Sequence, residues 1–230
     1  MSPNISETDL EALWVSIPAG RVDMRDDRIQ KAWSVDVAAF QLAKFPVTQA
    51  LYQAVVGENP STFQGDRLPV ESVSWMEAVH FCNSLSEALS IEPCYTRDPR
   101  TQQISLTPKA QGIRLPSEAE WQYACQAGTR DIRYGALADI AWFKENAQGK
   151  PQAVGQKQAN PWGLHDMLGN VWEWCSDVYD ETVYGSYRVF RGGGWCDEAR
   201  SVMATTRRRS HPTSFRIDDL GFRIAVNLGS

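Results

Sequence analysis

The segment G-L-H-D-M-L-G-N-V-W-E-W, from Gly163 to Trp174, is the most informative part of this sequence about its fold. Two further blocks follow it in the chain, R-V-F-R-G-G-G-W from Arg188 to Trp195 and L-G-F-R from Leu220 to Arg223. In these blocks large aromatic rings stand beside glycines, the residues that permit tight turns and close approach of backbones. Together the blocks predict a compact, loop-rich core and not a bundle of helices.

Length and composition limit the number of domains. The chain has 230 residues, of which 43% are hydrophobic, which suits one domain with a complete core. We expect residues 1–11 to form an N-terminal tail and residues 12–230 a single domain. The chain opens without a basic stretch followed by an apolar run, and it lacks any run of about eighteen apolar residues. Neither a secretion signal nor a membrane partner is therefore expected.

The cysteines indicate the compartment. The chain contains five cysteines, an odd number, and no C-x-x-C pair. This pattern argues against a disulfide framework and against a structural zinc site. The expected location is therefore the reducing cytoplasm.

Local patterns predict where helices begin. Pro46-Val47-Thr48 predicts a helix that continues to about residue 56 and stops at Gly57. Ser74 with Glu77, and Ser117 with Glu120, have the spacing of a capping box, which predicts a helix after each serine. Cys82 lies on the apolar stripe of the Ser74 helix, so we expect it in the core.

Alternation of apolar and polar residues predicts strands at 14–20 and 35–45. Loops are expected over residues 128–164, and short strands are expected to return near residues 173–176, 188–192 and 222–226. The predicted fold class is α+β with little regular secondary structure.

Charge is unevenly distributed. The net charge of the chain is −5, yet residues 188–223 hold eight arginines and four acidic residues. These arginines could brace a loop-rich region through carboxylates and carbonyls, or they could form a face for an anionic ligand. A nucleic-acid partner is not expected, because no helix-turn-helix, zinc finger or aromatic platform accompanies the arginines.

With these blocks the chain resembles the formylglycine-generating enzyme and sulfatase-modifying factor family. Further matching segments are Ile17–Gly20, Pro46–Thr48, Val70–Ala78 and Arg114–Tyr123, so the resemblance covers roughly residues 12–226. It implies a C-type-lectin-like fold. Since fold does not give function, the site residues need separate arguments.

The resemblance implies a structural calcium site. Asp166 and Glu173 would supply carboxylates, and Gly169 and Val171 would supply main-chain carbonyls, the oxygen ligands that Ca²⁺ prefers. The alternative is that Glu173 pairs with a buried arginine and that Asp166 caps a turn.

Oxidase members of the family bind Cu(I) through two cysteines after the Gly-Gly-x-aromatic turn. Here Cys196 falls near the first position, but Ala199, Ser201 and Val202 stand where the second would be sought. Soft Cu(I) needs both thiolates, so copper is not expected and no catalytic residue is assigned. The alternative function is a metal-dependent oxidase that acts on a peptide cysteine, with Cys196 as its catalytic residue.

Another branch of the family binds ligands without catalysis, through a surface between the Gly-Gly-x-Trp and Gly-Phe-Arg blocks that a retroelement diversifies. The equivalent residues here are 196–219, and we expect them to bind a protein or small-molecule ligand. The candidate ligand-binding residues are Cys196, Asp197, Glu198, Ser201, Met203, Thr205, Arg208, Arg209, Ser210, His211, Phe215 and Ile217.

This surface requires a rigid frame beneath it. We expect Trp172, Trp174, Trp195 and Phe222 to form the frame, and we expect Trp174 and Trp195 to be mostly buried. On the surface, Arg208, His211 and Phe215 should be substantially exposed.

Overall fold

The computed structural model describes residues 12–101, 103–107 and 110–228. Its helices and strands are, in chain order, β1 (Trp14–Ile17), β2 (Gly20–Asp26), β3 (Lys31–Val37), β4 (Phe40–Ala43), α2 (Gln49–Val56), α3 (Trp75–Ala88), β5 (Tyr95–Arg97), β6 (Ile104–Leu106), α4 (Glu118–Gln126), α5 (Leu137–Ile140), β7 (Trp172–Val178), α6 (Glu181–Tyr184), β8 (Arg188–Arg191), a 3₁₀ turn η1 (Ala199–Ser201), β9 (Arg207–Ser210), β10 (Leu220–Phe222) and β11 (Ala225–Asn227). This is the predicted loop-rich α+β class.

The predicted helices form where local chemistry favours them. Thr48 caps α2, and Gly57 ends it with a φ of 92°. Ser74 and Ser117 form the predicted capping boxes at the starts of α3 and α4. In each box the serine hydroxyl and a glutamate carboxylate satisfy backbone N–H groups that the first turn leaves unpaired.

The strand predictions were only partly correct. The strand predicted at 35–45 is divided between β3 and β4, and the one predicted near 222–226 is divided between β10 and β11. Strands β2 and β3 form a hairpin in which Val22 and Met24 point to the core while their neighbours are exposed. Because the neighbouring positions of β2 carry charged residues, the apolar pattern of the sequence did not predict this hairpin.

Two sheets position the C-terminal segment. One has the order β1-β4-β11, and the other has the order β10-β7-β8-β9 with β10 parallel to β7. A methyl group added to Gly221 in β10 would lie 2.1 Å from the carbonyl oxygen of Val70. Only glycine therefore fits this position of the Leu-Gly-Phe-Arg block.

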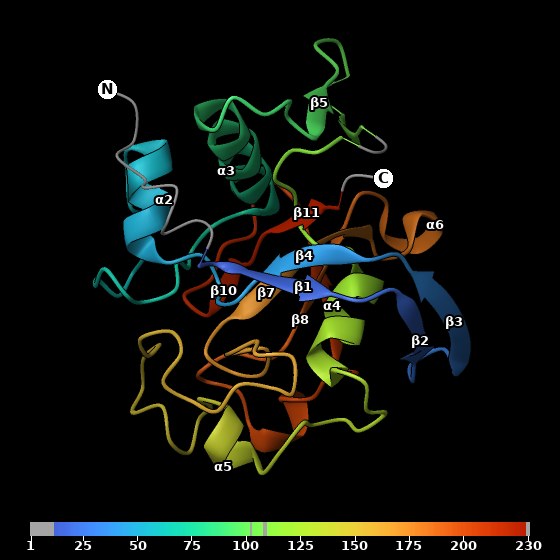
Figure 1. Cartoon of the computed structure of the whole chain (residues 1–230), viewed down its shortest axis with the longest axis vertical. Coiled ribbons are helices and arrows are strands. Elements are labelled where there is room, and N and C mark those ends of the chain that lie inside the picture. The colour runs from blue at the N-terminus through green and yellow to red at the C-terminus, as the bar shows by residue number, and fades with distance from the viewer. Residues whose placement is uncertain (1–11, 102, 108–109, 229–230) are drawn as a thin grey trace.

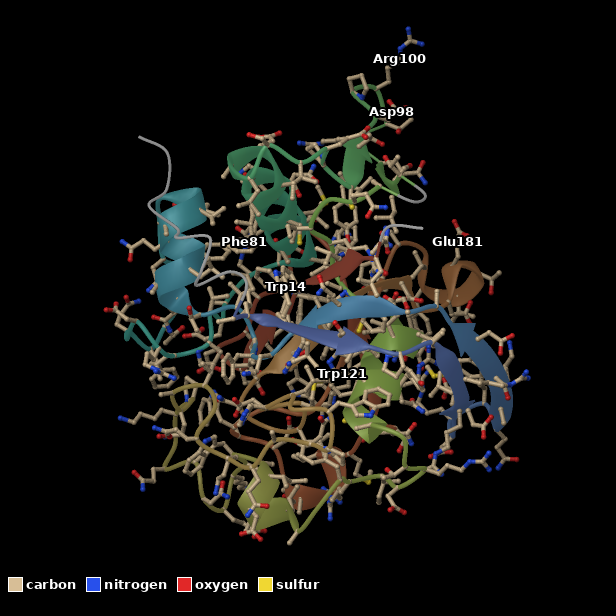
Figure 2. All side chains as sticks on the ribbon, viewed as in Figure 1. Trp14, Phe81, Asp98, Arg100, Trp121 and Glu181 are labelled. Carbon is tan, nitrogen blue, oxygen red and sulfur yellow. The ribbon has the colours of Figure 1, made fainter. Side chains whose placement is uncertain are left out.

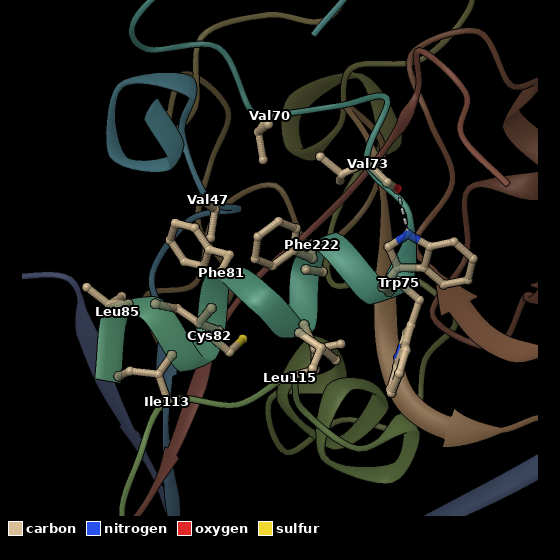
Figure 3. Packing of buried hydrophobic residues seen from close by; sticks show 14 of the residues in the cluster. Val47, Val70, Val73, Trp75, Phe81, Cys82, Leu85, Ile113, Leu115 and Phe222 are labelled. Carbon is tan, nitrogen blue, oxygen red and sulfur yellow. Dashed lines mark hydrogen bonds between the residues drawn. The ribbon is translucent and has the colours of Figure 1, made fainter. Parts of the chain in front are cut away.

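Two hydrophobic clusters form the core. In Figure 1, α2 and α3 lie on one side of the β1–β4 pair, and α4 and α5 lie on the other. The cluster beside α3 includes Phe81, Phe222 and the predicted core residue Cys82, which is fully buried (Figure 3). The second cluster surrounds Trp121 of α4, which Figure 2 labels.

Candidate ligand-binding surface

A glycine turn after β8 starts the 196–219 segment. Gly192 and Gly193 have φ values of 103° and 84°, which β-carbon-bearing residues rarely adopt. A β-carbon at Gly194 would lie 2.4 Å from an oxygen of Asp219. The turn therefore brings the beginning of the segment against its end.

Asp197 fixes this first part of the segment to the frame. Its Oδ2 accepts hydrogen bonds from Trp172 Nε1 at 2.6 Å and from Gly194 N at 2.9 Å. Its Oδ1 lies 3.2 Å from Arg208 Nη2, and the Arg208 guanidinium lies 4.5 Å from the centre of the Trp172 ring. A buried tryptophan thus holds the acidic residue that in turn orients Arg208.

Cys196 is exposed and lies beside a carboxylate. Its thiol donates to Asp219 Oδ2 at 3.1 Å, and partial burial together with Asp219 raises the pKa of Cys196 to about 12. Burial, with Asp197 and Asp218 nearby, raises the pKa of Asp219 to about 6. The thiol is therefore protonated at neutral pH, whereas metal binding and nucleophilic attack require the thiolate.

No candidate ligand-binding residue is buried. Exposed positions are Cys196, Glu198, Arg208 and His211, and the remaining candidates are half-buried. Glu198 pairs with Arg200 at 3.0 Å and with Lys144 at 3.7 Å, both on the surface. Such exposed pairs are weak, so these side chains remain free to contact a ligand.

Strand β9 divides the candidates between two faces of its sheet. Arg208 lies over Trp172, whereas Arg209 lies 3.7 Å from the ring centre of Tyr184 and 4.8 Å from that of Tyr179. Successive side chains of a strand point in opposite directions, so adjacent arginines cannot share one contact surface. Ser201, Met203 and Thr205 lie near Arg25 and Arg28 around a separate hollow of about 290 Å³.

Of the predictions about exposure, the one for Phe215 needs correction. Trp174 is fully buried and Trp195 is mostly buried, as predicted; the Trp195 indole donates to the Asp218 carbonyl at 2.9 Å and its ring contacts Phe63 edge-on at 5.5 Å. Phe215, expected to be exposed, packs parallel to Phe190 at 6.0 Å. Phe215 therefore belongs partly to the core, because stacking on a buried ring removes its apolar surface from water.

Three of the C-terminal arginines brace the fold: Arg191, Arg207 and Arg223 are buried or nearly so, and each pairs with a carboxylate. Arg200, Arg208 and Arg216 also pair with a carboxylate, but their side chains are exposed, so these pairs contribute little to stability. Arg188 and Arg209 have no carboxylate partner within the described part of the chain, and the Nε of each is buried without a hydrogen bond. The bracing interpretation is thus right for the three buried arginines, and it does not explain Arg188 and Arg209.

The predicted calcium ligand Glu173 is engaged by other groups. Its oxygens accept hydrogen bonds from Arg223 at 2.7 and 2.8 Å, and Trp121 Nε1 donates to Oε2 at 2.7 Å. Both charged side chains are completely buried. This is the alternative arrangement that the sequence left open, in which Glu173 pairs with a buried arginine.

Asp166, unlike Glu173, has a carboxylate oxygen without a partner. It is buried, its φ is 54°, and Oδ2 accepts from Gly155 N at 2.7 Å, while Oδ1 has no partner. Burial raises the pKa of this carboxyl. An unpaired buried oxygen fits a cation, but among the described residues no group of three or more His, Cys, Asp or Glu side chains is arranged to hold a metal. The calcium site predicted from Asp166, Glu173 and the carbonyls of Gly169 and Val171 stays a prediction, although Glu173 is already paired with Arg223.

Sequence patterns missed the neighbours that shape this surface. Three such neighbours come from distant segments, and no local pattern marks them: Phe63 contacts Trp195, Lys144 pairs with Glu198, and Tyr184 lies under Arg209.

None of the helices in the described ranges is long and apolar enough to cross a membrane.

Comparison with known proteins identifies the relatives of this chain. A model of the sulfatase-modifying factor enzyme 1-like domain matches residues 3–228. Chaperone protein LppX from Paenibacillus barcinonensis is 32% identical over 225 residues, which cover 82% of this chain and 79% of that protein.

Relatives also include a solved structure and an inactive enzyme. The structure of Treponema denticola variable protein 1 superposes with a TM-score of 0.85 and 32% identity, covering 94% of this chain and 95% of that chain. The inactive C-alpha-formylglycine-generating enzyme 2 from Mus musculus is 27% identical over 204 residues, which cover 80% of this chain and 57% of that protein.

Proposed function

Because the chain belongs to the family of sulfatase-modifying factor enzyme 1-like domains, we propose that it is a non-catalytic member that binds a ligand through residues 196–219. The observation that carries the proposal is the contrast between this surface and its frame. Trp172, Trp174 and Phe222 are completely buried, whereas none of the candidate side chains above them is. Exposed side chains on a fixed support are suited to recognition.

The contacts that we propose for this surface include the exposed Cys196, Glu198 and Arg208, and Asp197 holds Arg208 in place. Together they present an acidic and a basic group beside a thiol. Their charges suit a polar ligand, either a protein surface or a small molecule, because charge complementarity selects partners.

The chemistry of Cys196 supports a non-catalytic role. Its raised thiol pKa, about 12, keeps the sulfur protonated. The other cysteines are buried, including Cys175, whose thiol lies beside the carbonyl of Glu173. The name of the mouse relative, an inactive formylglycine-generating enzyme, fits the same interpretation. All five cysteines are free, which supports the proposed cytoplasmic location.

We also propose that the sequence of this surface is open to diversification, as by a retroelement. The solved relative from Treponema denticola is named a variable protein, which supports this proposal. Variation at Cys196, Glu198, Arg208 and His211 would change exposed atoms and leave the core intact.

The test is a binding screen. The purified chain is applied to protein and glycan arrays, and each hit is measured again with the double variant Glu198→Ala/Arg208→Ala and with Arg130→Ala. Arg130 is a matched control, because its side chain is 92% exposed and lies outside residues 196–219. We expect the double variant to lose binding and the control to keep it.

Equal binding by all three proteins would contradict the proposed surface. Incubation with Cu(I), oxygen and a cysteine-containing peptide tests the alternative. Conversion of the peptide cysteine to an aldehyde, lost in Cys196→Ser, would show an oxidase instead.

A further inference from the structure

Arg188 lies where an unpaired positive charge is costly. It is half-buried, Nη1 donates to the Ser176 carbonyl at 2.6 Å, and the guanidinium stacks over the Trp75 ring at 4.0 Å. Nε is buried without a hydrogen bond, and Nη2 has no hydrogen-bond partner in the described ranges. Burial lowers the pKa of Arg188, and the nearby Asp177 compensates the positive charge only in part.

This arginine lines a hollow of about 480 Å³, a size that suits a small organic ligand. The hollow lies between α3, the β5–β6 hairpin, α6 and the turn after β9. Figure 2 shows Asp98 and Arg100 at the far end of the projecting hairpin, and Glu181 on α6. Most residues that line the hollow lie outside residues 196–219. The hollow includes that segment only at His211, Pro212 and Thr213.

The walls combine apolar and basic side chains. Trp75, Met76, Ile104, Val178 and Pro212 supply the apolar contacts. Arg97, Arg188 and His211 supply basic groups, and the one acidic residue of the lining is the exposed Glu181. His211 Nδ1 lies 3.0 Å from the Thr213 hydroxyl and 3.2 Å from the Ser214 hydroxyl, so its ring is oriented.

From this arrangement we propose that the hollow binds an amphipathic monocarboxylate, with the carboxylate on Arg188 and the apolar body against Trp75 and Ile104. A carboxylate supplies the hydrogen-bond acceptors that Arg188 lacks, and charge-assisted hydrogen bonds of this kind are the strong ones. Free small acids and peptide C-termini share this chemistry. The site does not depend on the proposed function, because Arg188 and Trp75 lie outside the 196–219 surface.

Calorimetry with defined probes tests the proposal. The probes are 3-phenylpropionate, its amide, an acetylated tripeptide that ends in a phenylalanine carboxylate, and the amidated form of that tripeptide. We expect the wild-type chain to bind at least one acid and neither amide. Binding of the free acid, of the peptide acid or of both identifies the natural source of the carboxylate.

Variants locate the binding. Arg188→Gln should weaken binding by about 10-fold to 100-fold, because a hydrogen bond to a charged group is lost. Arg188→Lys should weaken it less, and the control Arg130→Gln should leave it unchanged. Arg188→Gln should also melt at an equal or higher temperature, because it removes a buried charge that Asp177 compensates only in part. If Arg188 only stabilised the fold, the same substitution would lower the melting temperature.

Val178→Glu provides a second variant at an exposed wall, where 37% of the residue is accessible. The added carboxylate should repel the acid without disturbing the core. Absence of binding by either acid at millimolar concentration would overturn the proposal. So would equal binding of acid and amide, or undiminished binding by both Arg188→Gln and Val178→Glu.

Discussion

Arg223 and Glu173 form an ion pair that is wholly buried, with Arg223 Nη2 2.7 Å from Glu173 Oε1 and Arg223 Nε 2.8 Å from Oε2. The pair joins the Gly-Phe-Arg block to the Trp-Glu-Trp block. Arg223 also donates to the carbonyls of Ala43 and His165, at 2.9 Å each. Two of the three blocks that reveal the family in the sequence are therefore connected through one guanidinium.

Breaking this pair from one side should be severe. Arg223→Met leaves the Glu173 carboxylate buried and uncompensated, and the expected loss of unfolding free energy is about 3 to 5 kcal/mol. Urea denaturation followed by tryptophan fluorescence measures it. The double variant Arg223→Met/Glu173→Met should lose less than the single one, because no lone charge remains. A double variant that is less stable than Arg223→Met would contradict this electrostatic explanation.

The predicted calcium site at Asp166 can be tested through its effect on stability. If a cation binds its unpaired oxygen, Ca²⁺ at about 100 times its dissociation constant should add roughly 2.7 kcal/mol of stability. The effect should appear as a higher melting temperature that chelator reverses and that Zn²⁺ does not reproduce. Asp166→Asn, which removes the charge and keeps an oxygen, should respond less. Identical melts in calcium and chelator, with no metal found in the protein, would show the calcium prediction to be wrong.

Asp219 should make stability depend on pH. Its folded pKa, about 6, lies above the ordinary value of 3.8, so the folded state holds this proton more tightly than the unfolded state. The resulting stabilisation is complete below about pH 4 and is lost as pH rises to about 6, by about 3 kcal/mol at most. Asp219→Asn should flatten this part of the stability curve. Asp177, whose pKa burial also raises to about 6, titrates in the same window and should remain visible in the variant.

Frame and surface should respond differently to truncation. Trp174→Ala removes a fully buried ring and should cost about 3 to 5 kcal/mol. Arg208→Ala and His211→Ala should each change stability by less than about 0.5 kcal/mol. Thermal melts of the purified variants measure both effects. A similar loss in all of them would mean that Arg208 and His211 belong to the fold.

Truncation of Phe215 should cost less stability than Trp174→Ala and more than Arg208→Ala or His211→Ala. Because its ring stacks on Phe190, Phe215→Ala should cost about 1 to 2 kcal/mol, part of the value for a fully buried side chain. The same melts measure it. An unchanged melting temperature would return Phe215 to the exposed class predicted from sequence.

Local chemistry made part of the structure predictable from sequence. A capping box joins Ser74 to Glu77 within one turn, so α3 could be placed without knowing the rest of the fold. Strand β9 could not be predicted from sequence, because residues 207–210 show no alternation of apolar and polar residues. It is held by pairing with β8 and by ion pairs from Arg207 to Glu118 and Asp26, which are distant in sequence.

The same limit applies to the site. The segment 196–219 was recognisable from its flanking blocks, but the division of Arg208 and Arg209 between two faces depends on β9 being a strand. Whether Glu173 would meet a cation or an arginine depended on where the fold places Arg223. Long-range placement therefore decided what residue types alone left open.

A saturation scan of residues 190–225 shows whether the recognition surface and the frame that supports it are independent. Each substitution is scored for the amount of folded protein and for binding to the ligand found on the arrays. We expect substitutions at Cys196, Glu198, Arg208 and His211 to reduce binding while leaving folded protein abundant. Loss of binding only where folded protein is also lost would contradict a recognition surface that is independent of its frame, and would assign these residues to the fold.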